Sequence, residues 1–167
     1  MGRGATKAAS NPWYKARLEA AKWNDMLSSR AGAADMFHCS IDTIDRIENG
    51  LNKCMSVDMA VLMADKYNAP HLLNHYCLNE CPIGCRQSLS EDVLSIERVT
   101  VKLLKGLRVD QLSDIKDKLV DIAADGVITD NEKPEIKEII SYLDELAKTV
   151  SELKIIGQIA LNGGNDD

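Results

Sequence analysis

Apolar residues recur at intervals of three and four along almost the whole chain, and this spacing constrains the fold more than any other feature. Such spacing places apolar side chains on one face of an α-helix, whereas a half-buried strand needs strict alternation. No segment of useful length alternates in that way, and only 4% of the 167 residues are aromatic. The sequence therefore predicts an all-α fold.

The first half of the chain divides into five predicted helices. The first begins at Pro12 and shows a stripe at steps of three and four: Trp13, Ala16, Ala20, Trp23 and Leu27. The fourth covers 57–68 and can start at Ser56 or Asp58, both good N-caps. A short fifth helix covers 71–76.

Two short helices lie between these elements. Ser28 or Ser29 offers an N-cap for a helix through about Phe37, and Ser40 caps the next one, which Gly50 ends. Two short helices joined by a tight turn predict a helix-turn-helix, whose second helix must project far enough to fit a DNA major groove.

The stretch SSRAGAADMFHCSIDTIDRIENG, 28–50, resembles the Cro/C1-type (Xre-type) helix-turn-helix family of bacterial and phage repressors. The matching positions are Ala34, Ser40, Ile44, Ile47, Glu48 and Gly50. The run 52–77 resembles the fourth and fifth helices of that family, so the resemblance covers about 13–80. It departs from the family at Gly32, in a region where a Gln is usual, and at His38, where the turn usually has Gly.

The resemblance implies a five-helix repressor-like domain and a transcriptional regulator that binds double-stranded DNA as a homodimer. The predicted helix from Ser40 would enter the major groove and turn five side chains toward the bases: Ile41, Asp42, Thr43, Asp45 and Arg46. Ser29, Arg30 and Lys53 would hold phosphates. In this family the position of Glu48 turns back to hold neighbouring backbone or basic side chains.

The charge distribution bears on this hypothesis. The net charge is −6, but residues 1–75 carry 9 Lys and Arg against 8 Asp and Glu. The acidic surplus therefore lies in the second half. Affinity for DNA comes mostly from phosphate neutralisation, and the candidate cations are few: Arg3, Lys7, Lys15, Arg17, Lys22, Arg30 and Lys53. We expect weak, salt-sensitive binding by one copy.

The acidic residues of the predicted helix that starts at Ser40 favour an alternative to DNA binding. Asp42 and Asp45 would approach a polyanion, although a carboxylate can accept a hydrogen bond from cytosine N4. The alternative is a repressor-like fold that contacts protein instead, as an antirepressor or adaptor would. An enzyme is not expected, because no phosphate-cradling glycine loop and no assignable nucleophile–base arrangement is present.

A cluster of possible metal ligands follows the fifth helix: His71, His75, Cys77, Cys81 and Cys85. The C-x3-C-x3-C spacing does not match the usual structural zinc pairs, so we expect packing roles and no metal or other cofactor. A metal site and a redox-active thiol pair remain alternatives. No apolar run is long enough for a membrane span and no secretory signal is visible, which favours a cytoplasmic protein with reduced thiols.

The second half predicts an α-helical bundle, 89–161, after a linker at 81–88. A helix capped by Ser90 and a second one ending at Gly126 precede a long C-terminal helix from about Asp130 to Leu161. That helix carries a heptad seam: Ile136, Ile139, Leu143, Leu146, Val150 and Leu153. The seam predicts dimerisation, packing within the chain, or both. Residues 1–12 and 162–167 are expected to be disordered.

Overall fold

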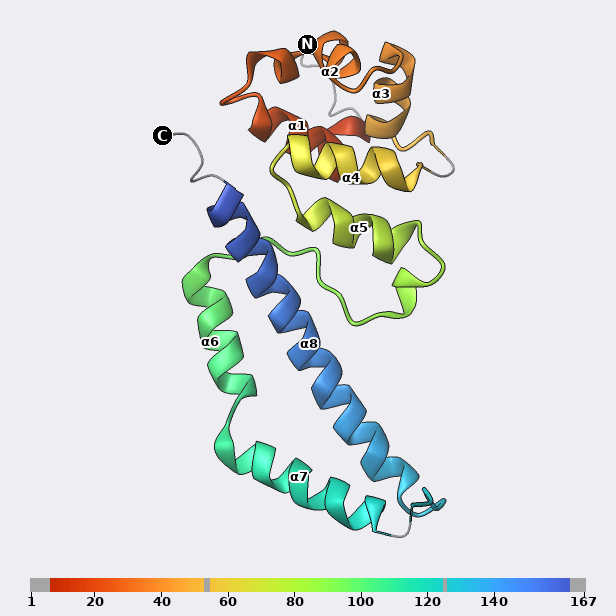
Figure 1. The fold of residues 1–167 in the computed structure, drawn as a ribbon, viewed down its shortest axis with the longest axis vertical. Coiled ribbons are helices and arrows are strands. Elements are labelled where there is room, and N and C mark those ends of the chain that lie inside the picture. The colour runs from red at the N-terminus through yellow and green to blue at the C-terminus, as the bar shows by residue number, and fades with distance from the viewer. Residues whose placement is uncertain (1–6, 53–54, 125, 163–167) are drawn as a thin grey trace, which may run out of the picture. The chain divides into compact units, whose positions relative to one another are not determined.

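The computed structural model describes residues 7–52, 55–124 and 126–162. Within these ranges the chain forms eight α-helices and no strand. Figure 1 labels these helices along the chain. The all-α prediction is confirmed. The described residues form two compact units, unit 1 with residues 7–87 and 158–162, and unit 2 with residues 88–157.

Unit 1 contains the five helices predicted for the first half of the chain: α1 Pro12–Ala20, α2 Arg30–Met36, α3 Ile41–Glu48, α4 Val57–Lys66 and α5 His71–Asn79. Four of these helices have a side-chain N-cap, whose oxygen accepts a hydrogen bond from a backbone N–H in the first turn. The capping residues are Asn11, Ser29, Ser40 and Ser56. Short 3₁₀ helices lie at Lys7–Ser10 (η1), Asp25–Ser28 (η2) and Gly84–Arg86 (η3).

The first helix is shorter than its apolar stripe predicted. It ends at Ala20, and Trp23 is 59% exposed, so the prediction that this residue lies on the helix's apolar stripe is wrong. Asn24 explains the break, because its side chain accepts a hydrogen bond from the backbone N–H of Met26 and opens η2. Leu27 is fully buried, but it reaches the core from η2.

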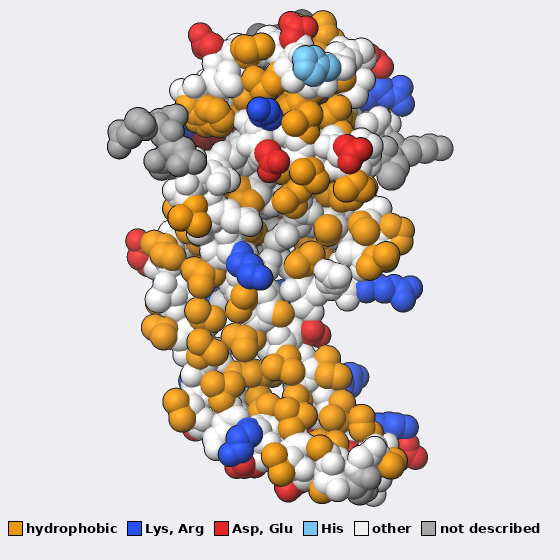
Figure 2. Space-filling view, in the orientation of Figure 1, with side chains coloured by type: hydrophobic (Ala, Val, Ile, Leu, Met, Phe, Trp, Pro, Cys, Tyr) orange, Lys and Arg blue, Asp and Glu red, His pale blue; other side chains and the backbone are white. Residues whose placement is uncertain are grey.

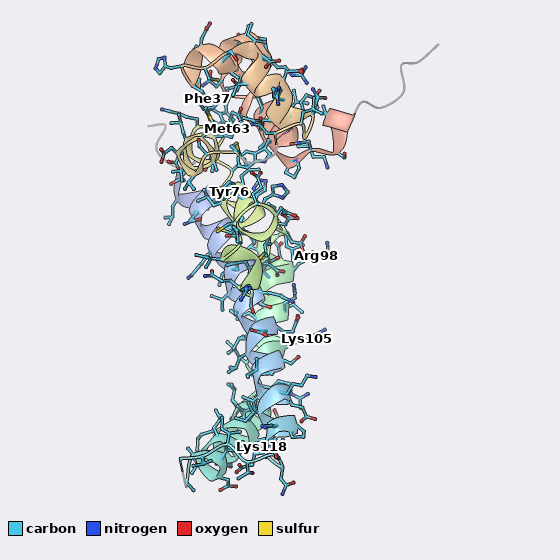
Figure 3. The ribbon with its side chains drawn as sticks, turned by 90° about the vertical axis from the view of Figure 1, so that its right-hand side faces the viewer. Phe37, Met63, Tyr76, Arg98, Lys105 and Lys118 are labelled. Carbon is cyan, nitrogen blue, oxygen red and sulfur yellow. The ribbon has the colours of Figure 1, made fainter. Side chains whose placement is uncertain are left out.

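The core of unit 1 is one continuous cluster drawn from α1 to α5. Figure 3 marks Phe37, Met63 and Tyr76, three buried residues from different segments of this cluster. Phe37 packs edge-to-face on Tyr67 with 5.5 Å between ring centroids. The prediction that residues 1–12 are disordered is wrong for 7–12, since η1 covers Lys7–Ser10, α1 begins at Pro12 and Ala8 is buried, whereas 1–6 lie outside the described residues.

Unit 2 is built from α6 Ile96–Gly106, α7 Val109–Ala123 and most of α8 Lys133–Asn162. The prediction that Ser90 caps the first of these helices is wrong, because α6 begins after Ser95. The buried Ser90 hydroxyl instead donates to Glu152 Oε1 at 3.1 Å. Residues 88–95 therefore form a non-helical segment that is bound to α8.

Polar contacts tie α6 to α8. Lys102 Nζ lies 2.7 Å from both carboxylate oxygens of Glu152, which is buried. The hydroxyl of Tyr142 donates to the carbonyl of Gly106. Among the described residues of unit 2, the buried hydrophobic side chains are few: Val99, Ile122, Ile139 and Ile155. This small core contrasts with the continuous cluster of unit 1.

Close packing explains why glycine occupies position 32. A Cβ atom built on Gly32 would lie 2.0 Å from the carbonyl oxygen of Met26, so the backbone of η2 packs directly on α2. No side chain fits there without moving the backbone of one segment.

Replacing Gly32 with Ala should destabilise the protein. Overpacking typically costs about 1–3 kcal/mol, and backbone cannot give way as a flexible side chain can. Gly157→Ala is the matched control, because nothing lies within 4 Å of its added Cβ inside α8. It should be neutral or stabilising by up to about 1 kcal/mol. Urea unfolding compares the two, and equal stabilities would contradict the close contact at Gly32.

Candidate nucleic-acid interface

α2 and α3 are joined by a four-residue connection, 37–40. His38 has φ +51°, a left-handed conformation that glycine adopts more easily. Phe37, at the end of α2, is 4% exposed and anchors the connection in the core. Ser40 Oγ then accepts from the backbone N–H of Thr43 at 3.1 Å and starts α3.

The inner side of α3 is held by apolar packing. Ile44 is fully buried and Ile47 is 4% exposed. Ala33 and Ala34 of α2 are buried as well, and their small side chains allow the two helices to come close. All four residues therefore belong to the core between α2 and α3.

A buried ion pair fixes α3 to α1. Arg17 Nε lies 2.5 Å from Glu48 Oε1, and both side chains are almost inaccessible to solvent. Arg17 also donates from Nη1 to the carbonyl of Leu27 at 2.8 Å. This contact ties α1, α3 and η2 at one point, and it explains why Glu48 points inward.

Arg30 extends this pair into a four-residue charge network. Its Nε lies 2.6 Å from Glu48 Oε2 and its Nη1 lies 2.5 Å from Asp45 Oδ1. The hydrogen bond that Arg30 donates to the Glu48 carboxylate is the main cause that raises the pKa of the Arg30 guanidinium, so this group stays charged. The network holds two arginines and two carboxylates, Arg17, Arg30, Asp45 and Glu48, so its formal charges cancel.

The network changes what α3 presents to a ligand. Two of its three acidic residues have cationic partners within the chain, which leaves Asp42 and Arg46 as its exposed charges of opposite sign. Ile41 is 54% exposed beside them. Within the described part of the chain, Arg46 makes no ion pair, so its guanidinium is available to a ligand.

The other predicted contact residues have different environments. Thr43 is half-buried, and its hydroxyl lies 2.8 Å from that of Ser40. Ser29 is exposed and caps α2 through the N–H of Gly32. Lys53 and Arg3, with the side chain of Lys7, lie outside the described residues.

One assignment from the sequence is wrong. Arg17 was a candidate phosphate ligand, but it is 3% exposed and cannot reach a phosphate. The sequence carried a weak signal of this, because Arg17 follows Ala16 and lies four residues after Trp13, beside the buried stripe of α1. Arg30 keeps about a third of its side chain exposed, but its first partners are carboxylates of its own chain.

The cysteine segment makes local contacts. Cys81 Sγ accepts from the N–H of Gly84 at 3.4 Å, and the thiol of Cys85 donates to the carbonyl of Pro82 at 3.3 Å. A Cβ on Gly84 would lie 2.6 Å from that of Cys77, so this turn also packs on α5. Among the described residues, no group of three or more His, Cys, Asp or Glu side chains could hold a metal ion.

The predicted dimerisation seam is divided between two environments. Ile139 is 4% exposed, and Leu146 lies against Gly106 of α6. Leu143 and Val150 are exposed, whereas Ile136 and Leu153 are half-buried. The seam as predicted therefore includes residues that the chain uses for its own packing.

No protein-family model, no curated protein and no solved structure matches this chain. Within the described ranges, no helix combines the length and the apolar character needed to cross a membrane.

The buried network predicts a large loss of stability for Glu48→Ala. Removing one partner leaves the Arg17 guanidinium buried without its counter-ion, which typically costs about 3–5 kcal/mol. Glu19→Ala is the control, because it removes the exposed Lys22–Glu19 pair and should cost at most about 1 kcal/mol. The free energy of unfolding in urea measures both. If Glu48→Ala lowers the free energy of unfolding no more than Glu19→Ala does, the network does not stabilise unit 1 as we infer.

Proposed function

We propose that the chain is a sequence-specific DNA-binding regulator of transcription of the Cro/C1 type, a binding protein and not an enzyme. In this proposal α3 enters the major groove, and two copies bind two half-sites. The observation that supports it best is the charge network. It neutralises Asp45 and Glu48 inside unit 1 and so removes most of the conflict between an acidic helix and a polyanion.

The arrangement of α2 and α3 also supports the proposal. α3 is fixed from its inner side by Ile44, Ile47 and Glu48, and its outer side is left open. A rigid helix with one buried and one exposed face can place side chains against base edges at a reproducible depth. Arg46 is the exposed cation of this helix, and guanidinium groups favour guanine O6 and N7 or a phosphate.

The small number of free cations sets the expected strength of binding. Arg17 is buried in the core and Arg30 is paired with carboxylates of its own chain. Few cationic side chains of unit 1 therefore remain to neutralise phosphates. One copy should bind weakly, and pairing two copies doubles the phosphate contacts.

A second candidate function is recognition of a protein by the same unit. Exposed hydrophobic side chains near the ends of α3 and along α4 favour it: Ile41, Leu51, Val57 and Val61. An antirepressor or adaptor would use such a surface without binding DNA.

Titration with salt distinguishes the two candidates. Fluorescence anisotropy with a random-sequence duplex, followed from low to moderate salt, should show binding. The logarithm of the binding constant should fall linearly with the logarithm of salt concentration. The slope gives the number of phosphates contacted. Absence of binding at the lowest salt would contradict the DNA proposal and favour protein recognition.

Arg46→Ala should weaken DNA binding by about five- to a hundred-fold, since one base-edge contact is worth about 1–3 kcal/mol. Lys116→Ala is the matched control, because it makes the same change in net charge at an exposed position of α7. Anisotropy at one fixed salt concentration compares them. Equal affinities of the two variants would remove Arg46 from the interface.

A further inference from the structure

α8 offers two different faces within unit 2. One face packs on the chain itself through Ile139, Thr149 and Glu152, all buried. Leu146 on the same side lies against Gly106, and Glu152 binds Lys102. These contacts occupy much of the seam that the sequence suggested for dimerisation.

A second apolar stripe runs along α8 beside this packed face. Its members are spaced by 4, 3, 4 and 3 residues: Ile136, Ile140, Leu143, Ala147 and Val150. Ile140 is 53% exposed, Leu143 46% and Val150 37%, and Ala147 is exposed as well. Alternation of 3 and 4 is the heptad pattern by which one helix packs along another. At 1.5 Å per residue the stripe is about 21 Å long.

The core of unit 2 buries only a small share of the unit's hydrophobic side chains. Fourteen large hydrophobic side chains in its described part are exposed, whereas four hydrophobic residues are buried. Figure 2 shows hydrophobic side chains gathered over α6, α7 and α8. A helical unit of this size normally needs a larger core or a partner. We therefore expect a partner surface to bury the exposed hydrophobic side chains of unit 2.

We propose that a second copy of this chain covers the stripe, so that two α8 helices pair through Ile136, Ile140, Leu143, Ala147 and Val150. This inference extends the proposed function, which requires two copies for two half-sites, and it rests on that function for its biological purpose. The surface itself is argued from α8 alone.

The chemistry of the stripe suits self-association. No charged side chain lies on it from Ile136 to Val150, so two copies meet without burying like charges. Its border carries both signs, with Lys137 and Asp144 each following a stripe residue. A two-fold interface brings the same patch of both copies together, and a border of mixed sign avoids repulsion there.

The stripe has a heptad repeat, and its proposed partner, a second α8, has the same repeat. A heptad surface accepts side chains from a helix with the same repeat, and a second α8 supplies one. A stable interface takes about 800 Å² from each partner, more than five residues provide. Exposed hydrophobic residues of α6 and α7 supply further apolar surface in the same unit.

Sedimentation velocity of the full chain, without DNA and over a range of concentrations, tests this inference. The wild-type chain should sediment as a dimer. Ile140→Glu should weaken the dimer by about a hundred-fold or more, because it buries a carboxylate in the middle of the interface. Ser141→Glu, one residue away on an exposed position outside the stripe, should leave the dimer unchanged.

Circular dichroism of each variant shows whether helix content is kept. If Ile140→Glu loses helix, Ala147→Glu provides the same test at an exposed small residue. A wild-type chain that is monomeric at every concentration, or an Ile140→Glu or Ala147→Glu chain that stays folded and dimeric, would overturn the inference. A monomer would leave the stripe to a helix of another protein. Because the measurement contains no DNA, a dimer that binds no duplex would contradict the proposed function and leave this interface standing.

Discussion

The buried Arg17–Glu48 pair is the interaction on which the geometry of unit 1 depends. A carboxylate with no exposure to solvent is costly unless it is paired, and Glu48 is paired twice, with Arg17 and with Arg30. These two arginines come from α1 and from the first turn of α2, and Arg17 also holds the carbonyl of Leu27. The orientation of α3 is therefore set by charges below it as much as by the apolar contacts of Ile44 and Ile47.

The acidic residues of α3 have two different roles, which the sequence alone does not distinguish. Three acidic residues lie within α3, and their number alone argues against contact with a polyanion. Two of them neutralise arginines of the same chain, so only Asp42 remains as an unshared carboxylate facing outward. Counting the charges along one helix therefore overestimates the acidity of its surface when the partners come from other helices.

Local signals in the sequence predicted the order of elements well. Ser29, Ser40 and Ser56 begin helices where expected, because capping is decided within three residues of the cap. Gly50 has φ +66° after α3, as a helix-ending glycine should. Non-local contacts escaped prediction: Arg17 meets a partner 31 residues away and Ser90 meets one 62 residues away. For the same reason the apolar stripe of α8 that faces its own unit could not be separated from the exposed one, since the two lie side by side with the same period.

The polar contact between Lys102, Ser90 and Glu152 has a consequence for the order in which the chain acquires structure. Every residue of the unit 1 core cluster lies between Trp13 and Tyr76, so that core is complete early in synthesis. Unit 2 forms later, because the carboxylate that binds both its amino-terminal segment and α6 belongs to Glu152, 62 residues after Ser90. Domains generally fold as units from the amino terminus while the rest emerges. The core of unit 1 can thus form on the ribosome, whereas unit 2 cannot close before Glu152 has been synthesised.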